Sequence, residues 1–297
     1  MISAARQPAV DSRQYVFSYV IRSAEDVPAD FPIPEPERLR TGLFLPRDGP
    51  DWFGRRAYPP RILLLEGDAI LVLTHPRYNE PPLRLALSGI VSYEIGHIFL
   101  IGWIRLVTAQ SAIHLPYNTG LDRSVSEFLD SFLHEYLADG LEWGNGAAVT
   151  FGPPLDIKFG NCLSAALRPN EHLCATWFSP PYQELRRWGP FRVSTDAAGH
   201  LVAYTDRRVL WITDHCNGRY ERYGSAVSTA PTRGVTGAQC DQDGDKSTLT
   251  ISLQFGASWS LPFPSERYAD AESFAREVET AVSRGTSPRH QSEAAQI

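Results

Sequence analysis

The sequence HLVAYTDRRVLWITD, residues 200–214, contains two runs of β-forming residues separated by a short polar stretch. Runs of this kind joined by a turn are typical of a β-hairpin. Further β-forming runs continue to residue 263, and YADAESFAREVETAVSRG follows at 268–285. Its apolar residues share one helical face: Phe274, Val278, Ala281 and Val282. The pattern predicts an antiparallel sheet closed by one amphipathic helix.

The same order of elements occurs earlier in the chain, around residues 55–139. RILLLEGD and AILVLTHP are close enough in sequence for a hairpin connection, with a tight turn predicted at Glu66-Gly67-Asp68. DRSVSEFLDSFLHEYLADG at 122–140 then repeats apolar residues at helical spacing. Strand runs that each end on a single helix predict an α+β protein that is mostly β, with two antiparallel domains.

The predicted domain organisation has five parts. RQYVFSYVIRS at 13–23 favours an added edge strand, and eight prolines between Val27 and Pro60 favour an extended wrap over a helix or central strand. We predict an N-terminal tail and proline-rich wrap at 1–54, a first domain at 55–140, a linker at 141–157, a second domain at 158–285 and a disordered tail at 286–297.

Composition narrows the classes of partner and compartment. The 297 residues carry a formal charge of −6, which disfavours broad nucleic-acid binding and membrane adhesion by bulk charge. The four cysteines show no C-x-x-C spacing, and the amino terminus has no apolar signal region, so we expect a cytoplasmic protein. The apolar stretch at 97–107 is too short to cross a bilayer and contains Arg105, so no transmembrane segment is predicted.

The stretch HLVAYTDRRVLWITD, with STLTISLQFGASWSLPF and the final helix, resembles bacterial pleckstrin-homology-like (PH-like) domains. The Thr-Asp-Arg-Arg run at 205–208 leads into a strand as in that family, and ALRPNEHLCATW at 166–177 resembles its Leu-Arg-Pro-x-Glu approach to the first strand. A more divergent copy is indicated upstream by ILVLTHP, LALSGIVSYEIGH, FLIGWIRL and HLPYNT, including the turn Glu94 to Gly96 and the pair Gly102-Trp103.

The resemblance implies two PH-like domains. Each would be a bent antiparallel sheet, or partly open barrel, capped by a C-terminal helix, and such scaffolds bind lipids, peptides or other proteins through variable loops. Lipid-binding members use basic residues around the loop that joins their first two strands. The matching turn of the first domain, Glu66-Gly67-Asp68, is acidic, so the resemblance does not favour phosphoinositide binding there.

Five arginines form the densest positive cluster and are the candidate residues for binding an anion or a partner. They are Arg186, Arg187, Arg192, Arg207 and Arg208. The alternative is that Arg207 and Arg208 stand at a strand entrance and pair with a neighbouring carboxylate of Asp206, Asp214 or Glu221.

Catalytic and metal-binding patterns are weak. His134-Glu135 lacks the second histidine of H-E-x-x-H, and DQDGD at 241–245 lacks the spacing of a calcium loop, so a hairpin turn explains it better. We therefore predict no catalytic residues, no metal and no cofactor. The spacing of the remaining polar candidates is not diagnostic of a metal or acid–base site, and these are His75, Glu94, His97 and His114.

The function predicted on these grounds is that of a non-catalytic adaptor that binds protein or peptide partners, with addition of a peptide strand to an exposed sheet edge as one way of binding. Two alternatives stay open. One is a membrane-peripheral or anionic-ligand module, including anionic lipid, that uses the arginine cluster. The other is an enzyme of unrecognised type.

Overall fold

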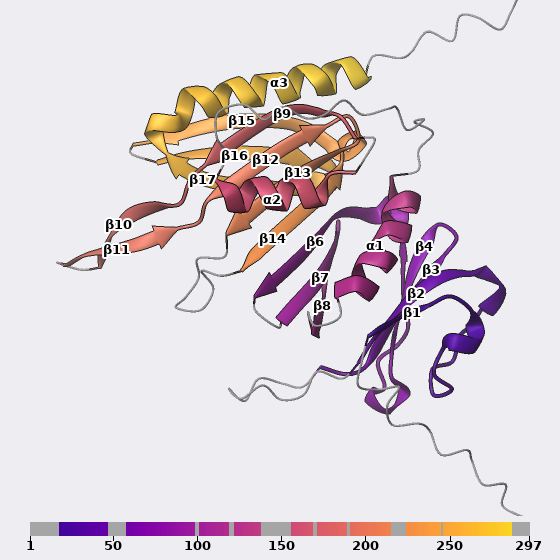
Figure 1. Cartoon of the computed structure of the whole chain (residues 1–297). Coiled ribbons are helices and arrows are strands. Elements are labelled where there is room, and N and C mark those ends of the chain that lie inside the picture. The colour runs from indigo at the N-terminus through magenta and orange to yellow at the C-terminus, as the bar shows by residue number, and fades with distance from the viewer. Residues whose placement is uncertain are drawn as a thin grey trace, which may run out of the picture. The chain divides into compact units, whose positions relative to one another are not determined.

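The computed structural model describes residues 18–46, 58–98, 101–118, 122–137, 156–168, 171–188, 191–214, 224–244 and 246–286. Strands dominate, and the strand pairs of known register are antiparallel, which confirms the mostly β α+β class. The chain divides into two compact units (Figure 1). The first comprises Met1–Gly89, Leu100–Trp103 and Leu115–Asp139; the second comprises Ile90–Phe99, Ile104–His114 and Gly140–Ile297.

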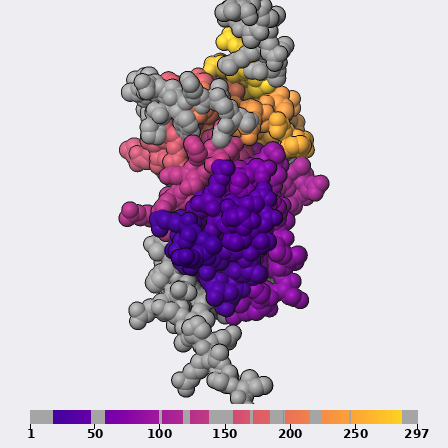
Figure 2. Space-filling view, turned by 90° about the vertical axis from the view of Figure 1, so that its right-hand side faces the viewer, coloured from indigo at the N-terminus to yellow at the C-terminus, as the bar shows by residue number. Residues whose placement is uncertain are grey.

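The first unit is built on a five-stranded antiparallel sheet of order β1-β2-β3-β4-β5. Helix α1 (Asp122–Tyr136) packs on β1 and β2. Short 3-10 helices lie at Ala24–Asp26, Pro36–Arg38, Pro76–Tyr78 and Leu87–Gly89. The strands are β1 (Tyr19–Ile21), β2 (Leu39–Leu45), β3 (Arg61–Glu66), β4 (Ala69–Thr74) and β5 (Leu83–Ala86). Figure 2 shows the indigo and purple surface of this unit from one side.

The predicted edge strand at 13–23 is confirmed for Tyr19–Ile21, because β1 pairs only with β2 among the described strands. Residues 13–17 lie outside the described residues. The predicted wrap is wrong for Leu39–Leu45, which forms the strand β2 between β1 and β3. The prolines flank this segment at Pro36 and Pro46 and leave it free to pair. Its Gly42 lies against β3, where an added Cβ would stand 2.7 Å from Cδ2 of Leu64.

The second unit contains a sheet in which five strands are neighbours in the order β6-β14-β13-β12-β9. A separate three-stranded sheet has the order β15-β16-β17. The five strands are β6 (Ile90–Ile98), β9 (Leu173–Ser179), β12 (His200–Thr205), β13 (Arg208–Asp214) and β14 (Ser225–Pro231), and the three are β15 (Val235–Asp243), β16 (Lys246–Leu253) and β17 (Ser258–Pro264). Strands β7 (Ile101–Thr108) and β8 (Ala112–Asn118) each have residues in both units.

The core of the second unit has two apolar layers, one on each side of the β9–β12–β13 surface. Helix α3 (Tyr268–Thr286) packs on β15 and β9, and its layer includes Trp177, Val202, Leu249 and Phe274. Helix α2 (Ile157–Ala166) covers the other face through Phe159 and Leu163. Further 3-10 helices lie at Thr232–Gly234, Gln254–Gly256 and Ser265–Arg267. Both predicted amphipathic helices, α1 and α3, are therefore confirmed as elements.

The unit boundaries differ from the predicted domain boundaries at 55–140 and 158–285. Strand β6, which the sequence places in the first domain, pairs with β14 in the second unit through residues such as Gly96 opposite Ala226. Hairpin proximity predicts which neighbouring runs pair, but it carries no signal for a pairing across more than 120 residues. The tails and most of the linker at 141–157 lie outside the described residues.

Two elements of the second unit are absent from the sequence-based prediction. The sequence carries two signals for helix α2. Asp156 is a capping residue, which accepts a hydrogen bond from the amide of Lys158, and apolar residues recur at helical spacing at Phe159, Cys162 and Leu163. Strand β14 follows a polar stretch and is rich in Ser, Ala and Thr, so its β signal is weak. Among the described helices, none is both long and apolar enough to cross a bilayer.

Candidate functional site

The candidate arginines fall into two groups in the structure. Arg186 and Arg187 lie on β10 (Tyr182–Trp188) and Arg192 lies on β11 (Phe191–Ala197), and these strands pair as a hairpin between β9 and β12. Arg208 instead begins β13 and Arg207 directly precedes it, and only 6% of Arg207 and 2% of Arg208 is exposed. The two groups therefore offer different chemistry.

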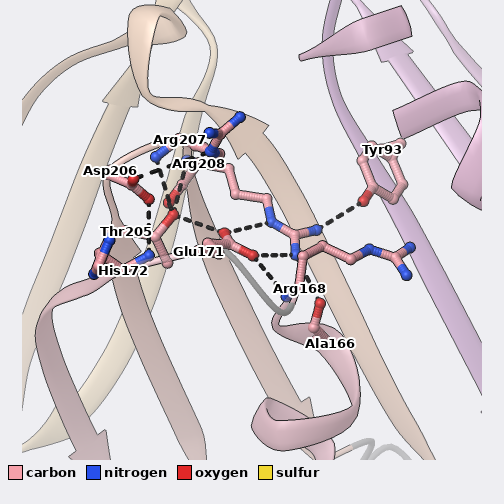
Figure 3. Close-up of polar contacts among 9 residues, drawn as sticks. All are labelled: Tyr93, Ala166, Arg168, Glu171, His172, Thr205, Asp206, Arg207 and Arg208. Atoms are coloured by element: carbon pink, nitrogen blue, oxygen red, sulfur yellow. Dashed lines mark hydrogen bonds and ion pairs between the residues drawn. The ribbon is translucent and has the colours of Figure 1, made fainter. Parts of the chain in front are cut away.

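Arg208 is held by a buried ion pair with Glu171 (Figure 3). Its Nε donates to Glu171 Oε1 and its Nη2 donates to Oε2, both at 2.7 Å, which is a bidentate arrangement. Nη2 also donates to the carbonyl of Ala166 at 2.7 Å, and Nη1 lies 3.5 Å from the hydroxyl of Tyr93. All of these contacts lie within the second unit, so Arg208 is occupied by the protein itself.

The carboxylate of Glu171 is equally well satisfied. It accepts from the hydroxyl of Thr205 at 2.7 Å and from the amide of Arg168 at 3.1 Å. Burial on its own would raise the pKa of Glu171, but the hydrogen bonds and charge of Arg208, with these two further bonds, outweigh burial and lower it. The same interactions raise the pKa of Arg208 against the opposing effect of burial. Both groups are charged at neutral pH.

Arg207 lies beside Asp206, with 4.0 Å between its Nε and Oδ2. This contact matches the alternative reading for Arg207, in which a neighbouring carboxylate pairs with it. For Arg208 the predicted carboxylate partners are wrong, because Arg208 pairs with Glu171. Asp214, one of the predicted partners, pairs with Lys158 instead. The partner lies 37 residues away, so neighbouring charges in the sequence could not identify it. Burial removes both arginines as ligands for an anion in solution.

A different surface of the second unit has the form of a binding site. Strand β9 lies at the edge of its sheet, and β12 is its sole strand partner within the described part of the chain. The carbonyl of Phe178 accepts from Nη2 of Arg267, at 2.8 Å, and therefore faces away from β12. Because backbone groups alternate along a strand, Thr176 also directs its N–H and C=O outward. Thr176 is exposed, as is Cys174.

A groove of about 770 Å³ runs beside this edge, between β9 and α3. The volume falls in the usual range for ligand sites, roughly 300–1,000 Å³. Its wall on the sheet side is made by Cys174 and Ala175 of β9 and by Tyr204 of β12. Its wall on the helix side is made by Ser273, Arg276, Glu277, Thr280, Ala281 and Arg284.

The groove combines apolar and charged side chains. Arg276 and Arg284 contribute two positive charges and Glu277 contributes one negative charge. Arg276 also bonds to Glu272 one helical turn away, at 2.9 Å, in an exposed pair. The Cys174 thiol is a poor nucleophile here, because its partial desolvation and the charge of Asp206 raise its pKa. The chemistry of the groove therefore suits recognition of a chain segment.

The other sequence candidates do not converge on a site. His75 bonds to the amide of Arg77 and lies 3.7 Å from Asp30, both in the first unit, whereas Glu94 accepts from Ser228 in the second. The structure describes no group of three or more His, Cys, Asp or Glu residues placed to hold a metal ion. Asp243 at the end of β15 pairs with Lys246 at the start of β16, as the predicted hairpin requires, and Gly244 has φ +59°. Asp245 lies outside the described residues.

Sequence reasoning did not identify the groove. Its signal in the sequence is slight, because the lining residues come from β9, β12 and α3, which are far apart in the chain. Comparison with known proteins does not add to the site, because no family model and no curated protein matches the sequence.

Proposed function

We propose that this protein is a non-catalytic, cytoplasmic binding protein that captures an extended peptide segment of a partner protein along β9. The peptide adds as a further strand to the free edge, and its side chains enter the groove under α3. The observation that carries the proposal is the coincidence of an open strand edge with a groove of about 770 Å³ beside it.

The edge supplies main-chain hydrogen bonds. Thr176 faces a prospective partner with one N–H donor and one C=O acceptor, as a strand in an antiparallel ladder requires. At the Phe178 end, Arg267 already occupies the carbonyl, which limits where an added strand can begin. The peptide is therefore expected to pair around Thr176 and Cys174, where the edge is exposed.

The groove supplies selectivity. Alternate side chains of an added strand point to the same face of the sheet, so every second peptide residue would meet Ala175 and Ala281. Small residues at these positions leave room for an apolar peptide side chain. Arg276 and Arg284 favour an acidic residue next to it, since guanidinium groups bind carboxylates in a two-pronged manner.

The arrangement of the second unit is also the reason to propose a PH-like fold for it. The strands β9, β12, β13 and β14 lie side by side, the three-stranded sheet β15–β17 follows, and α3 closes the unit at its end. This order supports the resemblance of the sequence to bacterial PH-like domains. Fold likeness alone does not select a ligand, so the groove and the open edge carry the functional proposal.

The test begins with a random-peptide display selection against the full-length protein. Enriched peptides would be titrated against the wild type, the Thr176→Pro variant and the Thr176→Val variant by fluorescence polarisation. Proline removes the outward N–H and is tolerated on an edge strand, whereas valine keeps the amide and the shape. We expect Thr176→Pro to weaken binding at least tenfold and Thr176→Val to leave it within about twofold.

Circular dichroism and thermal melting of both variants would establish that the fold is retained. Backbone hydrogen exchange of the complex should show protection at 173–178 and on the face of α3 that lines the groove. Enriched peptides that protect other segments, or that bind Thr176→Pro as well as the wild type, would refute strand addition at β9.

A further inference from the structure

Strand β9 and helix α3 run in opposite directions along the two sides of the groove. The carbonyl of Phe178, near the end of β9, accepts a hydrogen bond from Arg267, which directly precedes α3. Cys174 and Ala175, near the start of β9, line the groove together with residues of α3 between Ser273 and Arg284. The start of β9 therefore lies toward the end of α3.

The alternation of side chains along β9 determines which residues of an added antiparallel strand enter the groove. Ala175 and Trp177 face the core under α3, and Ala175 also lines the groove. Opposed residues of two antiparallel strands place their side chains on the same face of the sheet. The peptide residue opposite Ala175, which we number 0, therefore faces the groove. Position +2 lies opposite Leu173 and position −2 opposite Trp177, because the peptide runs against β9, and both face the groove as well.

The spacing of residues on α3 matches this alternation. Position 0 meets Ala281, which lines the groove together with Ala175. A helix rises about 1.5 Å per residue, so Arg284 lies roughly 4.5 Å beyond Ala281 along the axis and Arg276 roughly 7.5 Å before it. Alternate residues of a strand lie roughly 6.6 Å apart. Position +2 is therefore within reach of the Arg284 side chain, and position −2 is within reach of Arg276.

The two charged ends of the groove are not equivalent. Arg276 donates to Glu272 at 2.9 Å, and Glu277 lines the groove beside it, so nearby carboxylates offset its charge. Glu277 is the only acidic residue among the described residues that line the groove, and it lies two helical turns before Arg284. Glu279 lies closer in sequence, but its carboxylate is turned toward β15. The uncompensated positive charge is therefore at the Arg284 end.

We infer that the peptide captured at β9 lies antiparallel to it and carries an acidic residue two positions after the apolar residue at position 0. The inference rests on the proposed peptide binding and specifies its ligand: an apolar residue, any residue, and then Asp or Glu. A carboxylate at +2 pairs with the guanidinium of Arg284. A carboxylate at −2 meets Glu277 as well as Arg276 and gains little.

The first experiment measures the charge preference with the full-length protein. One display-selected peptide would be made with Glu, Gln or Lys at +2 and, separately, at −2. Position 0 is the apolar residue whose replacement by glycine weakens binding most. In fluorescence polarisation we expect Glu at +2 to bind about fivefold more tightly than Gln, and Lys about fivefold more weakly, as for a partly exposed ion pair. The same exchanges at −2 should change binding less than about twofold.

Variants of Arg284 assign this preference to one side chain. Arg284→Glu should reverse the order, so that Lys at +2 binds most tightly. Arg284→Gln should remove the preference and leave binding of the Gln peptide within about twofold of the wild type. The matched control is Arg123→Glu, which makes the same change of charge at an exposed position of α1 and should leave the preference at +2 intact. High salt should reduce the preference, because exposed charges are screened.

The direction of the peptide has a readout that does not depend on charge. Cys174 is exposed and faces position +1 of an antiparallel peptide, with the Cα atoms about 5.5 Å apart, a separation that a disulfide can span. In a parallel peptide it would face position −1. Peptides with a cysteine at +1 or −1, activated with thionitrobenzoate, would be mixed with the protein, and the adduct followed by mass spectrometry. We expect coupling at +1 to be more than tenfold faster than at −1 and to be lost in Cys174→Ser.

The outcomes separate this inference from the proposed function. A preference for Glu at −2 in place of +2, or faster coupling at −1, would overturn the inference while peptide capture at β9 still held. Binding that does not depend on the charge at +2, or a preference that Arg284→Glu does not reverse, would overturn it as well. Failure of the proposed function is a different result, since the selected peptides would then bind Thr176→Pro as tightly as the wild type.

Discussion

Replacing Glu171 by leucine should destabilise the second unit strongly. The change leaves the guanidinium of Arg208 buried, with 2% of its side chain exposed, and removes both hydrogen bonds at 2.7 Å. The contacts that remain, to the Ala166 carbonyl and the Tyr93 hydroxyl, are to uncharged groups. Breaking a buried ion pair on one side costs about 3–5 kcal/mol, because a buried charge is left without a counter-charge. We expect a loss of about that size.

The reverse single variant, Arg208→Met, should cost a similar amount, since it leaves the Glu171 carboxylate with its two weaker partners. The double variant should be less destabilised than either single variant, because it removes both charges together. A matched control is Glu272→Gln, which breaks the exposed pair with Arg276 and should cost less than about 0.5 kcal/mol.

The assay is urea unfolding of the full chain, read by hydrogen exchange of peptides from β12 and β13. Local peptides are needed because a chain with two compact units need not unfold in one step. A loss below about 1 kcal/mol for Glu171→Leu, or a double variant as unstable as the sum of the two single variants, would refute the ion-pair argument.

Three further predictions concern other parts of the molecule. Burial lowers the pKa of His200 to about 4, so between about pH 6.5 and 4 the unfolded chain binds a proton at His200 that the folded chain does not bind. The free energy of unfolding should therefore decrease as the pH is lowered from about 6.5 to 4, by up to roughly 3 kcal/mol, in chemical unfolding measured at several pH values. His200→Gln should reduce this pH dependence. Gly42→Ala should cost about 1–3 kcal/mol in chemical unfolding of the first unit, while Gly89→Ala, which meets no atom within 4 Å, should change stability by less than about 0.5 kcal/mol. Thr280→Trp, at an exposed position of the groove wall, should fill the groove and reduce affinity for display-selected peptides more than tenfold in fluorescence polarisation while the melting temperature stays unchanged; unaltered affinity would place the peptide elsewhere.

Local patterns in the sequence predicted the elements whose signals lie within about 20 residues. The apolar stripe of α3 and the turn at Gly67, with φ +60°, are examples. The strand β2 is not predicted because it lies within the proline-rich segment Val27–Pro60, although Leu39–Leu45 itself contains no proline. Strand β14 escaped because its Ser, Ala and Thr residues carry little β signal until neighbouring strands bury them.

The candidate site was less predictable for a physical reason. Density of arginine in the sequence does not distinguish a guanidinium that faces solvent from one that a distant carboxylate neutralises inside the protein. Arg208 and Glu171 are brought together only when α2, β9 and β13 pack. A groove likewise arises from the packing of two elements that are far apart in sequence, and neither Ala175 nor Ala281 is distinctive on its own.

The pairing of β6 with β14 determines how this protein can be dissected. A fragment that starts at residue 158 would lack β6, and the backbone groups of Ser225–Thr229 that β6 satisfies would become an uncovered ladder. The unpaired edge of β14 in such a fragment would favour self-association. A partner captured by the fragment would then be bound by an edge that β6 covers in the full chain. Shortened versions meant to retain the natural behaviour of the carboxy-terminal unit therefore have to begin upstream of Ile90.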